Sequence, residues 1–80
     1  MARILSAEGK KNLIGKRLVK LRKQHALSQR DLSYKLQLAG YDLDKNVITR
    51  IENYQRYVSD IELKGLCEVL QITSAELIDI

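Results

Sequence analysis

The 80-residue sequence predicts an all-α domain. Proline is absent, and the only aromatic residues are four tyrosines. Leu, Ile, Lys, Arg, Gln and Glu dominate instead, and this composition favours helices over a β-sandwich or barrel. Apolar residues make up 45% of the chain, which is enough for one core but leaves no room for a catalytic cleft with a separate substrate domain.

Asn12 can cap a first helix that runs to about Gln24. The apolar stripe of this helix consists of Leu13, Ile14, Leu18 and Leu21. Basic residues occupy most of its other positions, as expected for a helix with one solvated side. Residues 1–11 before it form either an arm or an extension of the helix.

A second helix begins after Ser28, because Asp31 three residues later completes the pattern of a capping box. Leu32 and Leu36 form its inner stripe, which Ala39 would extend. Gly40 then offers the left-handed residue with which many helices end.

Asp44 can cap a short third helix over about 45–53, with Leu43 and Ile48 placed for a hydrophobic staple. Ile48 and Ile51 face inward, which leaves a polar side that we call the outer face. This outer face consists of Lys45, Asn46, Thr49 and Arg50. It contains no acidic residue.

Two more pairs of capping type predict a fourth and a fifth helix. The pairs are Ser59 with Glu62 and Thr73 with Glu76. Cys67 falls in register with leucines of the fourth helix, which predicts a packed thiol rather than a reactive one. His25, near the end of the first helix, has an ordinary polar role at the carbonyl end and no catalytic one.

Charge is distributed unevenly along the chain. The formal net charge is +4, but residues 1–30 hold nine basic and one acidic residue, whereas residues 31–80 hold five basic and nine acidic residues. This polarity suits a protein that presents one side to a polyanion. Solvated helix faces that keep a small domain soluble are the alternative explanation.

Several functional classes find no support in the sequence. One Cys and one His cannot form an internal disulfide or a typical structural zinc site. Paired carboxylates, a nucleophile with its base and a phosphate-binding loop are not visible, so we expect no enzyme, no cofactor and no small-molecule effector. Without a signal-peptide or bilayer-spanning run, we expect a soluble cytoplasmic protein.

With these elements in order, the sequence resembles the lambda-repressor-like family, the Cro/repressor class of helix-turn-helix DNA-binding domains. The resemblance covers about residues 13–78, through IGKRLVKLRKQHALSQRDLSYKL at 14–36, ITRIENYQR at 48–56 and DIELKGLCEVLQITSAELI at 60–78. It implies a compact five-helix fold and assigns residues 12–80 to the DNA-binding domain.

The turn between the second and third helices departs from the family pattern. Gln37 stands where the family has a glycine, and residues 37–43 predict a lengthened turn. We expect this insertion to move Tyr41 and Asp42 outward.

The resemblance implies a sequence-specific double-stranded DNA-binding regulator of transcription, with repression as the first expectation. In this family the third helix enters the major groove, so the outer face supplies the base contacts. Arg or Lys can donate to guanine, Asn can pair with adenine, and the Thr methyl can touch a thymine methyl. A solvated helix face is the alternative.

The resemblance also assigns DNA phosphate contacts and one structural ion pair. The phosphate contacts fall on Gln29, Arg30, Asn53 and Arg56. Such contacts position a protein on DNA without reading the sequence, and the amides at a helix start favour the same anion. For Gln29 the alternative is ordinary polarity at a helix start. Arg22 and Glu52 match a salt bridge between the first and third helices.

Three residues replace frequent family residues in the connections. Ala26 stands where a glycine often ends the first helix, and a left-handed alanine costs on the order of 1 kcal/mol. Tyr54 and Gln55 replace a glycine and a lysine, which removes one expected phosphate partner. We expect Tyr54 and Tyr57 to pack on the fourth helix rather than stack on a sugar.

Most readers with this motif double their site by dimerising. The C-terminal helix offers Leu77, Ile78 and Ile80 for a homodimer contact, unless it simply folds back on the core. A protein-interaction module on the same fold, such as an antitoxin or an assembly factor, is the second functional hypothesis. The acid-free outer face favours DNA.

Overall fold

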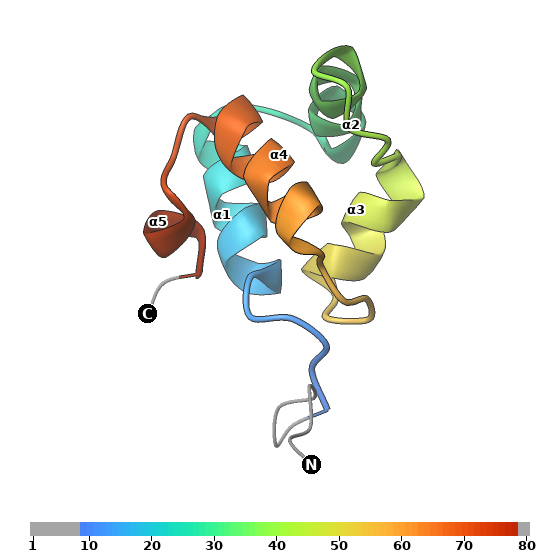
Figure 1. The fold of residues 1–80 in the computed structure, drawn as a ribbon, viewed down its shortest axis with the longest axis vertical. Helices are drawn as coiled ribbons and strands as arrows, with labels where there is room; N and C mark the ends of the chain where they lie inside the picture. The colour runs from blue at the N-terminus through green and yellow to red at the C-terminus, as the bar shows by residue number, and fades with distance from the viewer. Residues whose placement is uncertain (1–8, 79–80) are drawn as a thin grey trace.

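A computed structural model describes residues 9–78, which form five helices and no strands. The helices are α1 (Gly15–Gln24), α2 (Gln29–Leu38), α3 (Lys45–Glu52), α4 (Asp60–Leu70) and α5 (Ser74–Ile78). α3 packs against α1 and α2, while α5 packs against α1 and α4. The two therefore lie on opposite sides of the domain (Figure 1). The all-α, five-helix prediction is confirmed.

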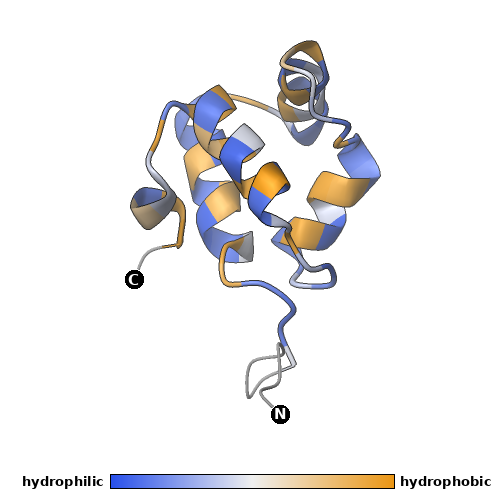
Figure 2. Ribbon diagram, in the orientation of Figure 1, coloured by the Kyte–Doolittle hydropathy of each residue, from blue (hydrophilic) through white to orange (hydrophobic). Residues whose placement is uncertain are grey.

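One core joins all five helices, and the apolar positions spaced three and four apart build it. It consists of Ile14, Leu18, Leu21, Leu32, Leu36, Leu43, Ile48, Ile51, Leu66, Leu70 and Leu77. Hydrophobic and hydrophilic residues accordingly share each of the longer helices (Figure 2). The prediction that Leu13 belongs to the apolar stripe of the first helix is wrong. α1 begins only at Gly15, and the Leu13 side chain is 69% exposed. Ala39 is also exposed, since α2 ends one residue before it.

Side-chain oxygens hold the helix starts, although the N-cap position of α1 is Ile14 and not the predicted Asn12. The Asn12 carboxamide oxygen accepts hydrogen bonds from the amides of Ile14 and Gly15, at 3.0 and 2.9 Å. Capping boxes form at Ser28 and Ser59, and the Asp44 carboxylate accepts from the amide of Val47. Thr73 and Glu76 exchange the same reciprocal bonds at the start of α5.

Four helix ends share one geometry, a residue with positive φ that lets a later amide bond back to the last turn. These residues are Ala26, Gly40, Tyr54 and Gln71. The bonds that follow run from Leu27 to Arg22, Tyr41 to Leu36, Gln55 to Arg50 and Ile72 to Cys67. Only Gly40 adopts this conformation without a Cβ penalty. Ala26 is left-handed, so the turn is not built differently to avoid the cost of about 1 kcal/mol.

The lengthened turn predicted over residues 37–43 begins later than expected, because Gln37 and Leu38 continue α2. The connection that remains, residues 39–44, packs against α4. A Cβ on Gly65 would come within 2.7 Å of the Tyr41 ring, so the ring lies directly on the α4 backbone. The Tyr41 hydroxyl donates to Glu68 at 2.9 Å, and this bond raises the pKa of Tyr41. The expectation that Tyr41 points outward is therefore wrong, because the glycine on α4 leaves room for it. Asp42 is exposed, as expected.

Of the predicted arm over residues 1–11, residues 1–8 lie outside the described part of the chain. Residues 9–14 are not helical. They lead directly into α1 and are called the arm segment below.

Candidate nucleic-acid interface

The two sides of α3 differ in exposure. Ile48 and Ile51 are 0% exposed and fix the inner side to the core. On the outer face, Lys45, Asn46 and Arg50 are exposed, and Thr49 is half-buried. The outer face therefore presents two cations and an amide on a helix whose other side is immobilised.

A buried ion pair ties α3 to α1. The Arg22 guanidinium donates to both carboxylate oxygens of Glu52, from Nε at 2.7 Å and from Nη2 at 3.2 Å. Its Nη1 donates to the carbonyl of Leu27 in the connection to α2. The side chains of Arg22 and Glu52 are only 11% and 5% exposed. The pair therefore joins α1, the following turn and α3 at one point.

Gln29 extends this ion pair to the outer face of α3. Its Nε2 donates to Glu52 at 2.7 Å, and its Oε1 lies 3.0 Å from the Thr49 hydroxyl. The Thr49 hydroxyl also points at the carbonyl of Lys45, at 2.9 Å. The single hydroxyl proton of Thr49 is shared between these two acceptors of the same chain, so Thr49 offers a partner its methyl group and the lone pairs of its oxygen.

Gln29 itself sits at the first residue of α2, half-buried between α2 and α3. Within residues 9–78, its Nε2 group makes one hydrogen bond, and an amide nitrogen carries two protons. The second proton remains for an external acceptor such as a phosphate oxygen. Arg30 beside it is exposed at the same helix start.

The Arg56 guanidinium, in the α3–α4 connection, is paired with a carboxylate and does not extend into solvent. Its Nη1 and Nη2 atoms donate to Glu62 at 2.8 and 2.7 Å, and this ion pair lowers the pKa of Glu62. Glu62 also accepts from the amide of Ser59 as part of the α4 capping box. Arg56 is thus bound to the start of α4, whereas Asn53 at the end of α3 is exposed. The phosphate contacts of both residues stay predictions.

Tyr54 packs on the start of α1 rather than on α4, so the expectation for this side chain is wrong. Its hydroxyl accepts from the amide of Lys16 at 2.9 Å, and its ring lies against Gly15, which has no side chain to exclude it. The Lys10 ammonium lies 4.6 Å from the centre of the same ring.

Tyr57 makes a similar cation–π contact with the next lysine, because the Lys11 ammonium lies 5.5 Å from the centre of its ring. Neither lysine stands out in the sequence as a residue with a role. The only signal was two consecutive lysines before the capping residue Asn12.

The start of α1 meets the end of α3 at backbone distance. A Cβ on Gly15 would lie 2.8 Å from the carbonyl oxygen of Ile51 and 2.9 Å from that of Glu52. The Asn12 Nδ2 atom donates to the carbonyls of Ile51 and Arg56, at 3.1 and 2.9 Å. Amide-rich and carbonyl-rich helix ends therefore face each other, which is a favourable arrangement of dipoles.

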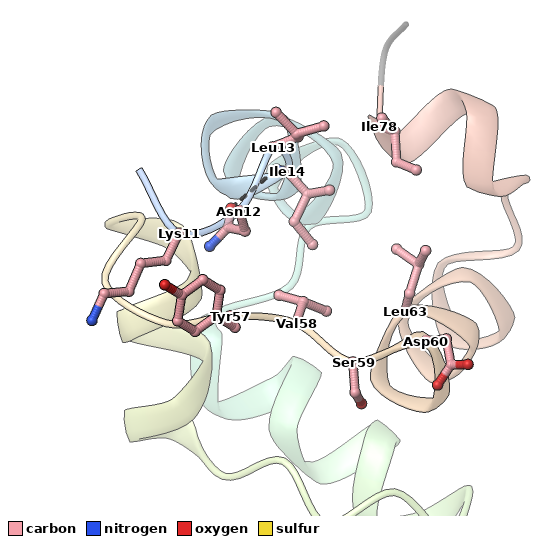
Figure 3. A pocket seen from close by; sticks show the side chains of 10 residues that line it. All are labelled: Lys11, Asn12, Leu13, Ile14, Tyr57, Val58, Ser59, Asp60, Leu63 and Ile78. Atoms are coloured by element: carbon pink, nitrogen blue, oxygen red, sulfur yellow. Dashed lines mark hydrogen bonds between the residues drawn. The ribbon is translucent and has the colours of Figure 1, made fainter. Parts of the chain in front are cut away.

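The prediction that Leu77, Ile78 and Ile80 form the dimer contact is wrong for Leu77. Leu77 is 0% exposed, because α5 folds back and buries it in the core, so it cannot contact a second copy. Ile78 is half-buried, and Ile80 lies outside the described residues. Ile78 lines an apolar groove of about 460 Å³ together with Leu13, Val58 and Leu63 (Figure 3).

Two other features bear on chemistry. In the part of the chain that the structure describes, no group of His, Cys, Asp and Glu side chains is placed to hold a metal ion, and no helix is long and apolar enough to span a membrane. Cys67 packs partly against the core, and its burial raises the pKa of the thiol.

Comparisons with known proteins agree with this geometry. No model of a protein family matches the chain, and no curated protein matches it. Among solved structures, the chain is similar to the crystal structure of the restriction-modification controller protein C.AhdI from Aeromonas hydrophila. That similarity has a TM-score of 0.70 and 33% sequence identity, over 80% of this chain and 86% of that one. The chain therefore belongs to the lambda-repressor-like (Cro/repressor class) family of helix-turn-helix domains.

Proposed function

We propose that this protein is a sequence-specific double-stranded DNA-binding regulator of transcription, which places α3 in the major groove. The observation that carries the proposal is the acid-free outer face of α3, held in place from behind by a buried polar network. The likeness to a controller protein supports a regulatory role. Repression, through occlusion of a promoter, is the mode that we propose.

Each residue of the outer face has a matching base edge. Lys45 and Arg50 donate to O6 and N7 of guanine, Asn46 pairs with adenine, and the Thr49 methyl touches the methyl group of thymine. Gln29, through its second Nε2 proton, binds a phosphate at the start of α2. Arg30 and Asn53 supply further backbone contacts, and Arg56 contributes only where its bond to Glu62 opens.

Selection of bound duplexes from a random pool at physiological salt tests the proposal. Wild-type protein should enrich one motif. Asn46→Ala and Arg50→Ala should each relax the preference at one position, at a cost of about 1–3 kcal/mol in binding free energy. Lys64→Ala, which removes an exposed cation of α4, is the matched control and should retain the motif. Failure of the wild-type protein to enrich any motif would reject the sequence-specific regulator.

A protein-interaction module on the same fold, such as an antitoxin or an assembly factor, is the competing function. It predicts no enrichment of duplexes and no effect of the outer-face variants on the binding of its partner. The two cations and the absence of acids on the outer face favour DNA over this alternative.

We further propose that two copies bind DNA together through the apolar groove beside α5. One α3 helix reads few base pairs, and pairing doubles the site. Leu13, which is 69% exposed at the groove, should be central: Leu13→Glu should give monomers in sedimentation. Ile61→Glu is the control, because Ile61 is 67% exposed but does not line the groove. A wild-type protein that stays monomeric both free and on DNA would exclude the dimer.

A further inference from the structure

The connection between α2 and α3 is the part of the helix-turn-helix to which the proposed function assigns no role. It comprises residues 39–44 and leads from the end of α2 into the start of α3 (Figure 1). Two of its side chains attach it to the rest of the domain. Leu43 is 1% exposed in the core, and the Tyr41 ring lies on α4. The connection is therefore held in place, although its other side chains are exposed.

The Tyr41 ring occupies a notch that exists because residue 65 is glycine. A Cβ at position 65 would lie 2.7 Å from Cγ and Cδ1 of the ring and 2.9 Å from Cδ2. Carbon atoms in ordinary contact are about 3.5–4.0 Å apart, so no other residue leaves room for the ring. Gly65 lies inside α4, where alanine would be the better helix former. The ring is fixed at its far end as well, since its hydroxyl donates to Glu68 at 2.9 Å.

The backbone of Tyr41 connects this notch to the start of α3. Its amide donates to the carbonyl of Leu36 at 2.8 Å, and its carbonyl accepts from the amide of Leu43 at 3.0 Å. The residue after Leu43 is the cap Asp44, whose carboxylate accepts from the amide of Val47 at 2.9 Å. A displacement of the ring would therefore reach the first turn of α3 through only three residues.

The two halves of α3 are held by different contacts. The last turn is tied to α1 and α2 through Glu52, which accepts from Arg22 and Gln29. In the part of the chain that the structure describes, residues 45–48 form no hydrogen bond to another helix. Outside α3 they bond only to Asp44. The first half of α3 therefore depends on the connection for its polar attachment.

We infer that Tyr41 is a positioning residue for DNA recognition, because its ring in the Gly65 notch sets the angle at which the first turn of α3 meets the bases. This inference rests on the proposed function. Lys45 and Asn46 extend from that first turn, whereas Arg50 extends from the half that is tied to α1 and α2. Hydrogen bonds weaken steeply as their angle departs from linear, so a rotated first turn loses base contacts.

Tyr41→Ala, which empties the notch, tests the inference. Selections with Asn46→Ala and Arg50→Ala first assign one position of the motif to each half of α3. At the Asn46 position, Tyr41→Ala should reduce the preference for the best base by about five- to tenfold, close to the worth of one base contact. At the Arg50 position the preference should stay within about twofold of wild type. Competition between duplexes that differ at one position measures both ratios.

A folding defect cannot produce this pattern. Loss of folded protein lowers the affinity for every duplex by the same factor and leaves the ratios unchanged. Tyr34→Ala is the matched control, since it removes a tyrosine of α2 that is 62% exposed, and it should retain both ratios. Wild-type ratios in Tyr41→Ala, on duplexes that wild-type protein selects, would overturn this inference alone. Failure of wild-type protein to enrich any motif would overturn the proposed function and this inference with it.

The conservative variant separates the ring from its hydroxyl. Tyr41→Phe keeps the ring in the notch and loses the bond to Glu68, so it should retain the wild-type ratios. A Phe variant with the ratios of Tyr41→Ala would contradict the assignment to the ring.

Gly65→Ala tests the same contact from the side of α4. Its methyl group would lie 2.7 Å from the ring, so it should displace Tyr41 and reduce the preference at the Asn46 position as Tyr41→Ala does. Added to Tyr41→Ala, it should change nothing further, because the notch is already empty. Additive effects of the two substitutions would show that the ring and Gly65 do not act as one contact, and would overturn the inference.

Discussion

The inner and outer sides of α3 share one helical backbone, but the polar side chains of the inner side are buried and paired, whereas those of the outer side are mostly exposed. Inside, Glu52 accepts hydrogen bonds from Arg22 and Gln29 and is 8% exposed. Outside, Asn46 and Arg50 extend into solvent. The inner polar groups are used to hold the helix in place, whereas the outer ones remain available to a partner.

This difference separates stability from recognition within one short helix. A change on the inner side should alter the free energy of unfolding, and through it every activity of the protein. A change on the outer side should alter binding alone. Thr49 lies between the two, because its hydroxyl belongs to the inner network and its methyl to the outer face.

The largest effect is expected from Glu52→Ala. It leaves the Arg22 guanidinium buried without its partner, which should lower the free energy of unfolding by about 3–5 kcal/mol. For a domain of this size each kcal/mol corresponds to roughly 4–8 °C in Tm, so thermal unfolding measures the loss directly. Glu52→Gln, which retains an oxygen acceptor, should lose less. A Tm equal to that of wild type would show that the pair is not structural.

Gly15→Ala should be the next in size. The added methyl would meet the carbonyl oxygens of Ile51 and Glu52 at 2.8 and 2.9 Å, so α1 must move away from α3. We expect a loss of about 1–3 kcal/mol in urea unfolding. Lys16→Ala, one residue later and exposed, controls for helix propensity. A stability equal to that of wild type would mean that the two helix ends separate without cost.

Glu62→Gln tests the ion pair that binds the Arg56 guanidinium to the start of α4. At pH 7 it should cost about 1–2 kcal/mol of unfolding free energy, since a charge-assisted pair becomes a neutral one. The pKa of Glu62 lies below its ordinary value of 4.5, so the carboxylate stabilises the fold above that pH. This contribution is lost as the pH falls through the lowered pKa. The gap between variant and wild type should therefore close on acidification, and parallel pH profiles would contradict the assignment.

The smallest effect on stability is expected on the outer side. Asn46→Ala and Arg50→Ala should leave the free energy of unfolding within about 0.5 kcal/mol of wild type, because both side chains are exposed. The same variants are the ones expected to lose sequence preference. A large loss of stability in either would mean that the two sides of α3 are not separable.

Much of the fold could be predicted because its signals are local. Ser28, Asp44 and Ser59 each accept from an amide three residues later, and the core leucines repeat every three or four positions. The exposure of Leu13 and the burial of Leu77 could not be predicted from such local signals. A stripe of apolar residues does not reveal at which turn the helix starts, nor whether a short last helix folds back on the core.

The candidate site divides in the same way. Its outer face follows from the register of α3 with Ile48 and Ile51, and the partners Arg22 and Glu52 follow from the family resemblance. The partners of the other side chains follow neither from the register of α3 nor from the family resemblance. The bond of Arg56 to Glu62 and the two lysine–tyrosine contacts depend on how the connections fold.

The helices, their order and the polar side of α3 could be predicted from the residues alone, because caps and apolar periodicity act within one or two turns of the chain. The packing of the helices determines that Arg22 and Arg56 are paired, and where Tyr41, Tyr54 and Tyr57 pack. Asn12 and Arg56, for example, are 44 residues apart and meet through a single hydrogen bond. Contacts of this kind depend on which backbones approach closely enough, and Gly15 and Gly65 permit that approach only once the helices have packed.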